Sequence, residues 1–135
     1  MRMILRALLG LTGLILALIG LNTAFGGMAT LGWQFPRFDL PDTSVEIARH
    51  DSNARFFAAT FSGMAIAMAL AAWRLKPFAS VAIAFLLAIA LGGLSRLLHP
   101  GYSPISDLAL LPSLLAEIIA APLLALWTYR ESQKP

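Results

Sequence analysis

The sequence predicts an all-α protein whose four transmembrane helices form a bundle. Of its 135 residues, 59% are hydrophobic and 13% are charged, whereas soluble domains carry about 25% charged residues. Mean hydropathy is +0.77, and long apolar runs recur along the chain. Each span needs roughly 20 apolar residues to cross a ~30 Å hydrocarbon core. The chain has room for about four such spans, so we expect a single integral membrane domain over residues 1–135.

The first predicted helix covers about residues 3–25, with Arg2 and Arg6 at its start. A basic start followed by an apolar run is also typical of a secretory signal peptide, and Ala24-Phe25-Gly26 has the small-x-small form of a cleavage site. The apolar run is long for a signal peptide, and no soluble domain follows it. We therefore interpret the segment as a retained span.

Residues 26–53 form the longest polar connection, which we expect to be one long outer loop between the first two helices. Within it, Thr43-Ser44-Val45-Glu46 has the S/T-x-x-E form of a capping box, in which two side chains satisfy free backbone N–H groups. This motif predicts a short helix from about Ser44, and a loosely ordered loop is the alternative.

The second and third predicted helices cover about residues 53–73 and 77–98. Only Arg74-Leu75-Lys76 separates them, and so short a link makes the two helices antiparallel neighbours. Pro77 suits the first turn of the third helix, where a missing N–H costs no helical hydrogen bond.

The fourth predicted helix covers about residues 108–129, after a Pro/Gly/Ser-rich turn at 99–107. Pro122 lies inside this helix and removes the N–H that would bond the carbonyl of Ile118. We therefore expect a kink about one turn beyond Glu117.

Basic residues at the helix ends predict the topology. Six of them fall on one side of the predicted spans and two, Arg37 and Arg49, on the other. Lys and Arg are enriched in cytoplasmic segments, so this bias places both termini in the cytoplasm. The six residues on the predicted cytoplasmic side are Arg2, Arg6, Arg74, Lys76, Arg130 and Lys134.

Three charged residues lie at the edges of or inside the apolar runs: Arg55, Arg96 and Glu117. A charge at bilayer depth costs roughly 2.5–3.5 kcal/mol on insertion scales, so it is retained where it finds a partner, water or head groups. The predicted helices bring all three residues to the outer half of the bundle. We therefore predict one polar cluster there, with further hydrogen-bond partners in Asn53, Ser95 and Ser113.

Small residues lie at four-residue steps from each of these charges. Such residues let transmembrane helices approach closely, although four-residue steps drift by about 40° each around an ideal helix. The pattern predicts that the three charges point inward along packing ridges. These ridges are Gly92, Ala88, Ala84 and Ser80 for Arg96; Ala59, Gly63, Ala67 and Ala71 for Arg55; and Ser113, Ala121 and Ala125 for Glu117.

Other interpretations of the charges stay open. Each arginine is near a helix end and can extend its side chain to the head groups. Glu117 has less freedom, because at depth it either pairs with an arginine or carries a proton. The cluster is then either a structural clamp or a site for a ligand or a proton.

The sequence offers little other chemistry. The chain has no cysteine, which excludes disulfides and thiolate sites. His50, Asp51, His99 and Asp107 all fall on the predicted outer side, but they lack the spacing of a metal site, so we expect no metal and no cofactor. No catalytic or nucleotide-binding motif occurs, we predict no catalytic residue, and no basic block is dense enough to bind nucleic acid.

The residues that begin and end the inner helices resemble a known family. Ser52-Asn53-Ala54-Arg55-Phe56-Phe57 opens the second helix, Gly92-Gly93-Leu94-Ser95-Arg96 closes the third, and Glu117 lies in the last. In this pattern, over about residues 3–128, the chain resembles the DUF4345 group of uncharacterised small bacterial membrane proteins with four helices. Its turn His99-Pro100-Gly101 departs from the acidic turn of that group. The resemblance implies a fold and a membrane location and carries no known activity.

We therefore expect a multi-pass protein of the bacterial inner membrane. A non-enzymatic bundle that binds a partner protein or a lipid-like ligand around the Arg/Glu cluster is the first hypothesis. The competing hypothesis is an enzyme or carrier for a hydrophobic substrate, with Glu117 as proton donor. A clamp predicts direct contact of arginine and glutamate, whereas a site predicts a pocket bounded by all three charges.

Overall fold

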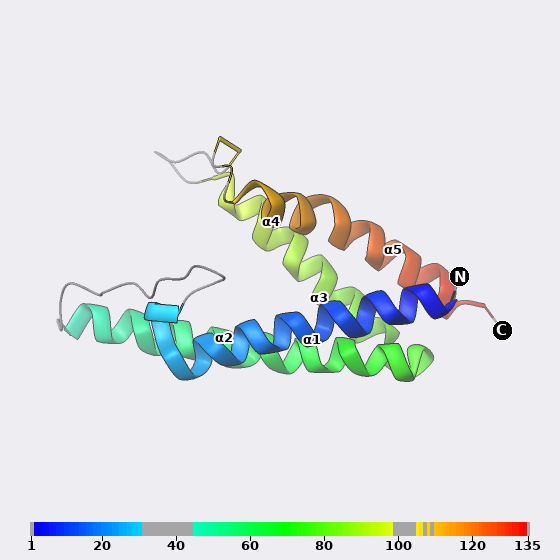
Figure 1. Ribbon diagram of the computed structural model, residues 1–135, viewed down its shortest axis with the longest axis horizontal. Coiled ribbons are helices and arrows are strands. Elements are labelled where there is room, and N and C mark those ends of the chain that lie inside the picture. The colour runs from blue at the N-terminus through cyan, green and yellow to red at the C-terminus, as the bar shows by residue number, and fades with distance from the viewer. Residues whose placement is uncertain (1, 31–44, 99–104, 107, 109, 135) are drawn as a thin grey trace.

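The computed structural model describes residues 2–30, 45–98, 105–106, 108 and 110–134. Within these ranges the side chain of Glu46 is not described. All regular structure in this part of the chain is helical (Figure 1). The elements are α1 (Arg2–Gly26), η1 (Gly27–Thr30), α2 (Val45–Trp73), α3 (Leu75–Arg96), α4 (Leu111–Leu115), the π-helical turn η2 (Ala116–Ala120) and α5 (Ala121–Ser132).

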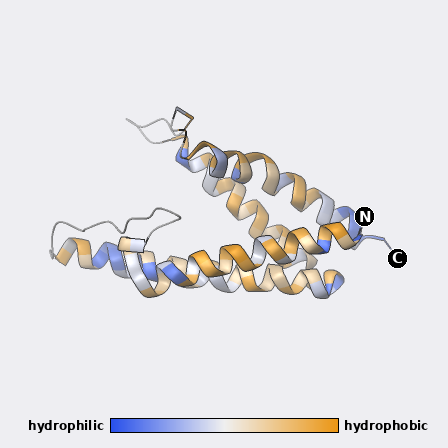
Figure 2. Ribbon diagram, viewed as in Figure 1, coloured by the Kyte–Doolittle hydropathy of each residue, from blue (hydrophilic) through white to orange (hydrophobic). Residues whose placement is uncertain are grey.

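Four helical segments are long and apolar enough to cross a membrane: Arg2–Thr30, Ile47–Trp73, Leu75–Arg96 and Leu111–Ser132. Figure 2 shows apolar residues along the helices and hydrophilic residues gathered toward their ends. The prediction of an all-α protein with four transmembrane helices is thus confirmed.

The helix bounds differ from the predicted ones mainly in α2. We expected a short helix from about Ser44 and a separate span from Asn53, but α2 runs without a break from Val45 to Trp73. The start of the capping-box motif, at Thr43 and Ser44, lies outside the described residues. A polar surface does not end a helix that has no glycine or proline, and none occurs between Val45 and Ser62.

The other three spans lie close to their predicted positions. A single residue, Arg74, separates α2 from α3, and Pro77 is in the first turn of α3 as expected. Pro112 stands at the start of α4, where a proline is tolerated. The last helix extends to Ser132, three residues beyond the predicted end at 129.

The helices form two antiparallel pairs, α1 with α2 and α3 with the α4–η2–α5 segment (Figure 1). The pairs converge at the end that holds Arg2, Arg74 and Ser132, here called the terminal end. They diverge toward the opposite end, at which α1 and α3 finish, here called the loop end.

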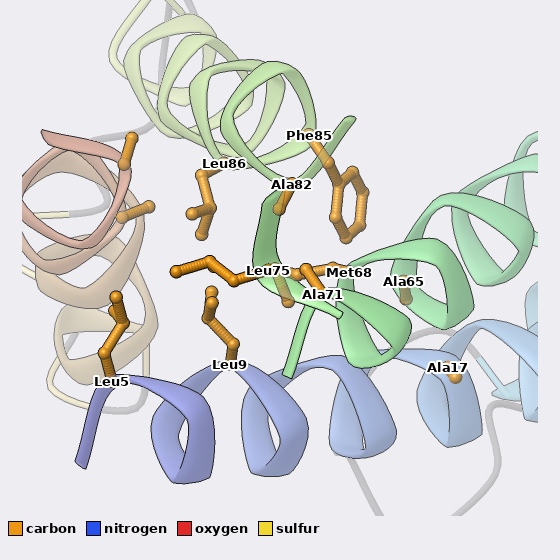
Figure 3. Close-up of a cluster of buried hydrophobic side chains, with 12 residues drawn as sticks. Leu5, Leu9, Ala17, Ala65, Met68, Ala71, Leu75, Ala82, Phe85 and Leu86 are labelled. Atoms are coloured by element: carbon orange, nitrogen blue, oxygen red, sulfur yellow. The ribbon is translucent and has the colours of Figure 1, made fainter. Parts of the chain in front are cut away.

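Most of the hydrophobic core lies where the two pairs converge. Leucines of α1 there meet side chains from α2, α3 and α5 (Figure 3). Phe61 of α2 packs edge-on against Phe85 of α3, with 4.9 Å between ring centroids. The main buried side chains are Leu5, Leu9, Met68, Ala71, Leu75, Ala82, Phe85, Leu86, Ala121 and Ala125.

Small residues hold α1 and α2 together along most of their length. A Cβ placed on Gly13 would lie 2.7 Å from the backbone N of Ala69, and one on Gly20 would lie 2.9 Å from the carbonyl of Ala58. Contacts this short leave no room for a side chain, so these glycines let the two backbones approach.

Of the three predicted packing ridges, the one on α3 is wrong and the one on α2 is right only at its end, where Ala71 is buried. On α2, Ala59 and Gly63 are exposed, and on α3 Ser80, Ala84, Ala88 and Gly92 are exposed. The buried face of α2 instead follows Ser62, Ala65, Met68 and Ala71, and that of α3 includes Ala82, Ala90 and Gly93. Only the ridge of Glu117 packs as expected, through Ala121 and Ala125. The neighbouring helix determines which face of a helix packs. Four-residue steps from a charged residue do not identify that neighbour, so they do not predict the packed face.

Candidate functional site

Arg96 and Glu117 form an ion pair that joins the end of α3 to η2. Nη2 of Arg96 lies 3.0 Å from Oε1 of Glu117, with 44% of the arginine side chain and 18% of the glutamate side chain exposed. Gly93 allows this approach, because a Cβ at that position would lie 2.7 Å from Cβ of Glu117. The small residue that serves Arg96 is therefore Gly93 and not the predicted Gly92.

The helix around Glu117 is widened into a π-turn. Residues Ala116–Ala120 form this turn, and α5 continues from Ala121 with Pro122 near its start. A proline inside a helix lacks one N–H and its ring clashes with the carbonyl four residues earlier, and a π-turn is one way to accommodate both. The irregularity that we expected one turn beyond Glu117 thus includes Glu117 itself.

The second carboxylate oxygen of Glu117 has no partner in the described part of the chain. Oε2 is buried and makes no hydrogen bond to those residues. Arg96 thus neutralises the charge through one oxygen and leaves the other available to accept a hydrogen bond.

Arg55 is bound elsewhere, and its described contacts do not join it to Arg96 and Glu117. Its Nε lies 2.6 Å from Oδ2 of Asp51, and its Nη1 donates to the carbonyls of Ala24 and Phe25 at the end of α1. The other oxygen of Asp51 accepts the N–H of Met28 at 2.7 Å. Arg55 and Asp51 therefore fasten α2 to the last turn of α1.

The local backbone explains this alternative partner. The last carbonyls of a helix lack intrahelical donors, and Gly27, with φ of +67°, turns the chain so that Met28 faces Asp51. Asp51 is four residues before Arg55 on the same helix, the spacing at which side chains meet. The sequence does not predict this pair, because the predicted second helix begins only at Asn53 and leaves Asp51 outside it.

The three predicted hydrogen-bond partners do not join the ion pair. Asn53 is exposed on α2. The hydroxyl of Ser95 donates to the carbonyl of Gly92 at 2.7 Å, and that of Ser113 donates to the carbonyl of Leu110 at 2.9 Å. Both hydroxyls are satisfied within their own helix, a common alternative for serine.

The terminal end holds a buried acid, Glu131, that the sequence does not predict as part of a site. Glu131 has only 2% of its side chain exposed, lies 3.4 Å from Nε of Arg2 and is also paired with Lys134. The predicted helix ended at 129 and left this residue outside. Its signal is the spacing of Ala121, Ala125 and Thr128, a buried stripe that Glu131 continues.

A family model described as "Domain of unknown function (DUF4345)" matches residues 4–128. The chain belongs to the DUF4345 family. No curated protein and no solved structure matches it significantly. The DUF4345 match includes Arg55, Arg96 and Glu117 and ends three residues before Glu131.

The described part of the DUF4345 chain brings no three His, Asp or Glu side chains together in a way that could hold a metal ion. His99 and Asp107, two of the four residues considered for such a site, lie outside the described residues. His50 and Asp51 are on α2, where Asp51 is bound by Arg55.

In this DUF4345 chain, α2 and α3 pack against each other near their middles. Toward the loop end, the same two faces separate. Phe61 and Phe85 are in contact, but Phe57, one turn further along the same side of α2, is 68% exposed. On α3, Gly92 and Arg96 follow Phe85 by seven and eleven residues. At about 100° per residue, both point within about 20° of Phe85 around the helix axis, so the three residues share one face of α3. A Cβ on Gly92 would meet nothing within 4 Å. We call Phe57, Gly92 and Arg96 the diverging faces.

Proposed function

We propose that this DUF4345 chain is a non-enzymatic protein of the bacterial inner membrane that binds a lipid-like ligand between the diverging faces. The observation that carries the proposal is the separation of α2 from α3 beyond the Phe61–Phe85 contact. Those faces offer an exposed aromatic ring on one helix, open space at Gly92 on the other and a guanidinium at the end. Apolar surface that ends in a cation suits an amphiphile with an anionic head.

Arg96 is suited to hold that head group. A guanidinium carries five N–H donors, and the contact with Glu117 leaves nearly half of this side chain exposed. Arg96 is the last residue of α3, a position at which arginine reaches the interface between hydrocarbon and head groups. Glu117 orients the guanidinium, so the same ion pair serves as a clamp between α3 and η2.

Direct contact of Arg96 with Glu117 favours the clamp among the interpretations of this pair. Two hollows in the described part of the chain are lined by other residues, one near Asn22 and one near Glu131. The ligand therefore lies beside the ion pair and along the diverging faces, where the membrane gives it access.

Filling the space at Gly92 tests the proposal. Gly92→Leu adds a side chain between the diverging faces, and its Cβ meets nothing within 4 Å. The fold should therefore persist while retained ligand falls severalfold. Gly63→Leu is the matched control, because Gly63 is also surrounded by open space but lies about 160° from Phe61 around α2. The measurement is mass spectrometry of amphiphiles that co-purify from native membranes.

Equal retention by the wild type and Gly92→Leu contradicts the proposal, as does equal loss in Gly63→Leu. Co-purification of a polypeptide that Gly92→Leu removes would show that the diverging faces bind a protein partner instead. Melting temperatures of the variants in detergent confirm that each retains its fold.

A further inference from the structure

We infer that the terminal end carries a second binding site, for the phosphate of an anionic phospholipid, formed by Arg2, Arg6 and Lys76. These residues line a hollow of about 140 Å³ whose remaining walls are Leu75 and Glu131. The walls come from α1, α3 and α5, so the site exists only in the folded protein.

The charges around this hollow are unbalanced. Its one acid, Glu131, is already paired with Arg2 and with Lys134. Arg6 and Lys76 form no ion pair with any residue that the structure describes, and both are exposed. Arg2 and Lys134 thus already neutralise Glu131. The charges of Arg6 and Lys76 are not offset, which leaves the hollow positive and able to accept an anion.

Glu131 gives the site its shape. Its side chain is almost completely buried and holds Nε of Arg2 at 3.4 Å, while Nη2 of Arg2 donates to the carbonyl of Lys134 at 3.2 Å. The Arg2 guanidinium is therefore fixed against the end of α5 and does not extend freely into solvent. A fixed guanidinium loses less conformational entropy when it binds a phosphate than a free one does.

The position of the hollow selects a lipid over a soluble anion. Arg2 and Lys76 lie at the ends of two candidate spans, and Arg6 lies one turn inside the first. Leu75, with 5% of its surface exposed, provides an apolar wall beside the cations. Basic pockets between transmembrane helices at head-group depth are suited to anionic lipid heads, whose acyl chains continue along the neighbouring apolar helices.

Lipid retention in nanodiscs tests the site. The full-length chain is placed in nanodiscs with equal amounts of phosphatidylglycerol and phosphatidylcholine, and native mass spectrometry counts the lipids that stay bound after release from the disc. We expect the wild type to retain phosphatidylglycerol preferentially. Arg6→Gln and Lys76→Gln should each reduce that retention about fivefold, the factor that ~1 kcal/mol per basic residue gives.

Arg74→Gln and Arg130→Gln are the matched controls. Both remove an exposed basic residue at the terminal end, but neither residue lines the hollow. Retention equal to wild type in these controls supports the site, whereas losses as large as those in Arg6→Gln show only a diffuse positive surface and overturn it.

Two further outcomes contradict the inference. Equal retention of phosphatidylcholine would show that the phosphate charge is not recognised, and displacement of bound phosphatidylglycerol by inorganic phosphate would show a site for a soluble anion. The Gly92→Leu variant keeps this site, since it lies at the opposite end of α3, so failure here leaves the ligand proposed above unaffected.

Discussion

At the level of single residues, the contact between Arg96 and Glu117 decides how the loop end of the second helix pair is held. The contact is partly exposed, with 44% and 18% of the two side chains accessible. Removing one partner of a fully buried pair costs about 3–5 kcal/mol, while exposed pairs contribute below about 1 kcal/mol. This pair falls between the two cases.

Charge reversal at this pair is a direct prediction. Glu117→Arg places two guanidinium groups against each other and should lower the free energy of unfolding by about 2 kcal/mol, between the limits for exposed and buried pairs. Adding Arg96→Glu should restore at least half of the loss. Thermal unfolding in detergent, followed by size-exclusion chromatography, measures both effects.

A control separates pairing from net charge. Arg49→Glu changes the total charge by the same amount as Arg96→Glu, and Arg49 is exposed on α2. Combining it with Glu117→Arg should restore nothing. Recovery of equal size with Arg49→Glu, or none with Arg96→Glu, would refute the ion pair as a clamp.

At the level of helices, the sequence predicts spans well and packing faces poorly. Span length and basic ends depend on composition along the chain, and the four spans lie near their expected positions. Arg96 and Glu117 were paired correctly because buried charges have few partners. The pairing of Arg55 with Asp51 is not predicted, because it requires Asp51 to lie in the same helix as Arg55. That depends on where α2 begins, and α2 begins earlier than the sequence predicts.

Packing faces depend on which helix lies opposite, and a single sequence does not contain that information. The predicted packing faces start from a charge on each helix. Because α1 carries no charge in its middle, the sequence predicts no packing face for it. Yet the glycines of α1, at positions 10, 13 and 20, are those that come closest to α2. The signal was present as small residues at near-regular spacing.

Gly13 is the sharpest test of this interface. In Gly13→Ala the new Cβ would lie 2.7 and 2.8 Å from backbone atoms of Ala69 and Ala65, which have no rotamer to change, so the helices must move apart. Overpacking costs about 1–3 kcal/mol, against a gain of up to about 1 kcal/mol in helix propensity. A net destabilisation of about 1–2 kcal/mol should appear in unfolding by sodium dodecyl sulfate.

Gly63→Ala is the control for Gly13→Ala. It brings the same gain in propensity on α2 with nothing within 4 Å of the new carbon, so its stability should equal or slightly exceed that of the wild type. Equal stabilisation in both variants would mean that α1 and α2 do not approach as closely as described.

At the level of the whole molecule, charge is distributed unevenly between the two ends. Six of the ten basic residues, at the starts of α1 and α3 and at the end of α5, lie at the terminal end. Acids do not offset them there, since Glu131 is buried within its own ion pairs. The positive-inside rule counts Lys and Arg close to the span ends, so the proposed orientation puts the terminal end in the cytoplasm.

Because the chain has no cysteine, single cysteines can report this orientation without background. We expect Arg74→Cys and Arg130→Cys to react with a membrane-impermeant maleimide only after cells are lysed, because both positions are exposed at the terminal end. Arg49→Cys, exposed at the loop end, should react in intact spheroplasts. The opposite pattern would place the terminal end outside and move the phospholipid site to the outer leaflet. Labelling of Arg74→Cys and Arg130→Cys on different sides would contradict the span count itself, since the four helices bring both positions to one end.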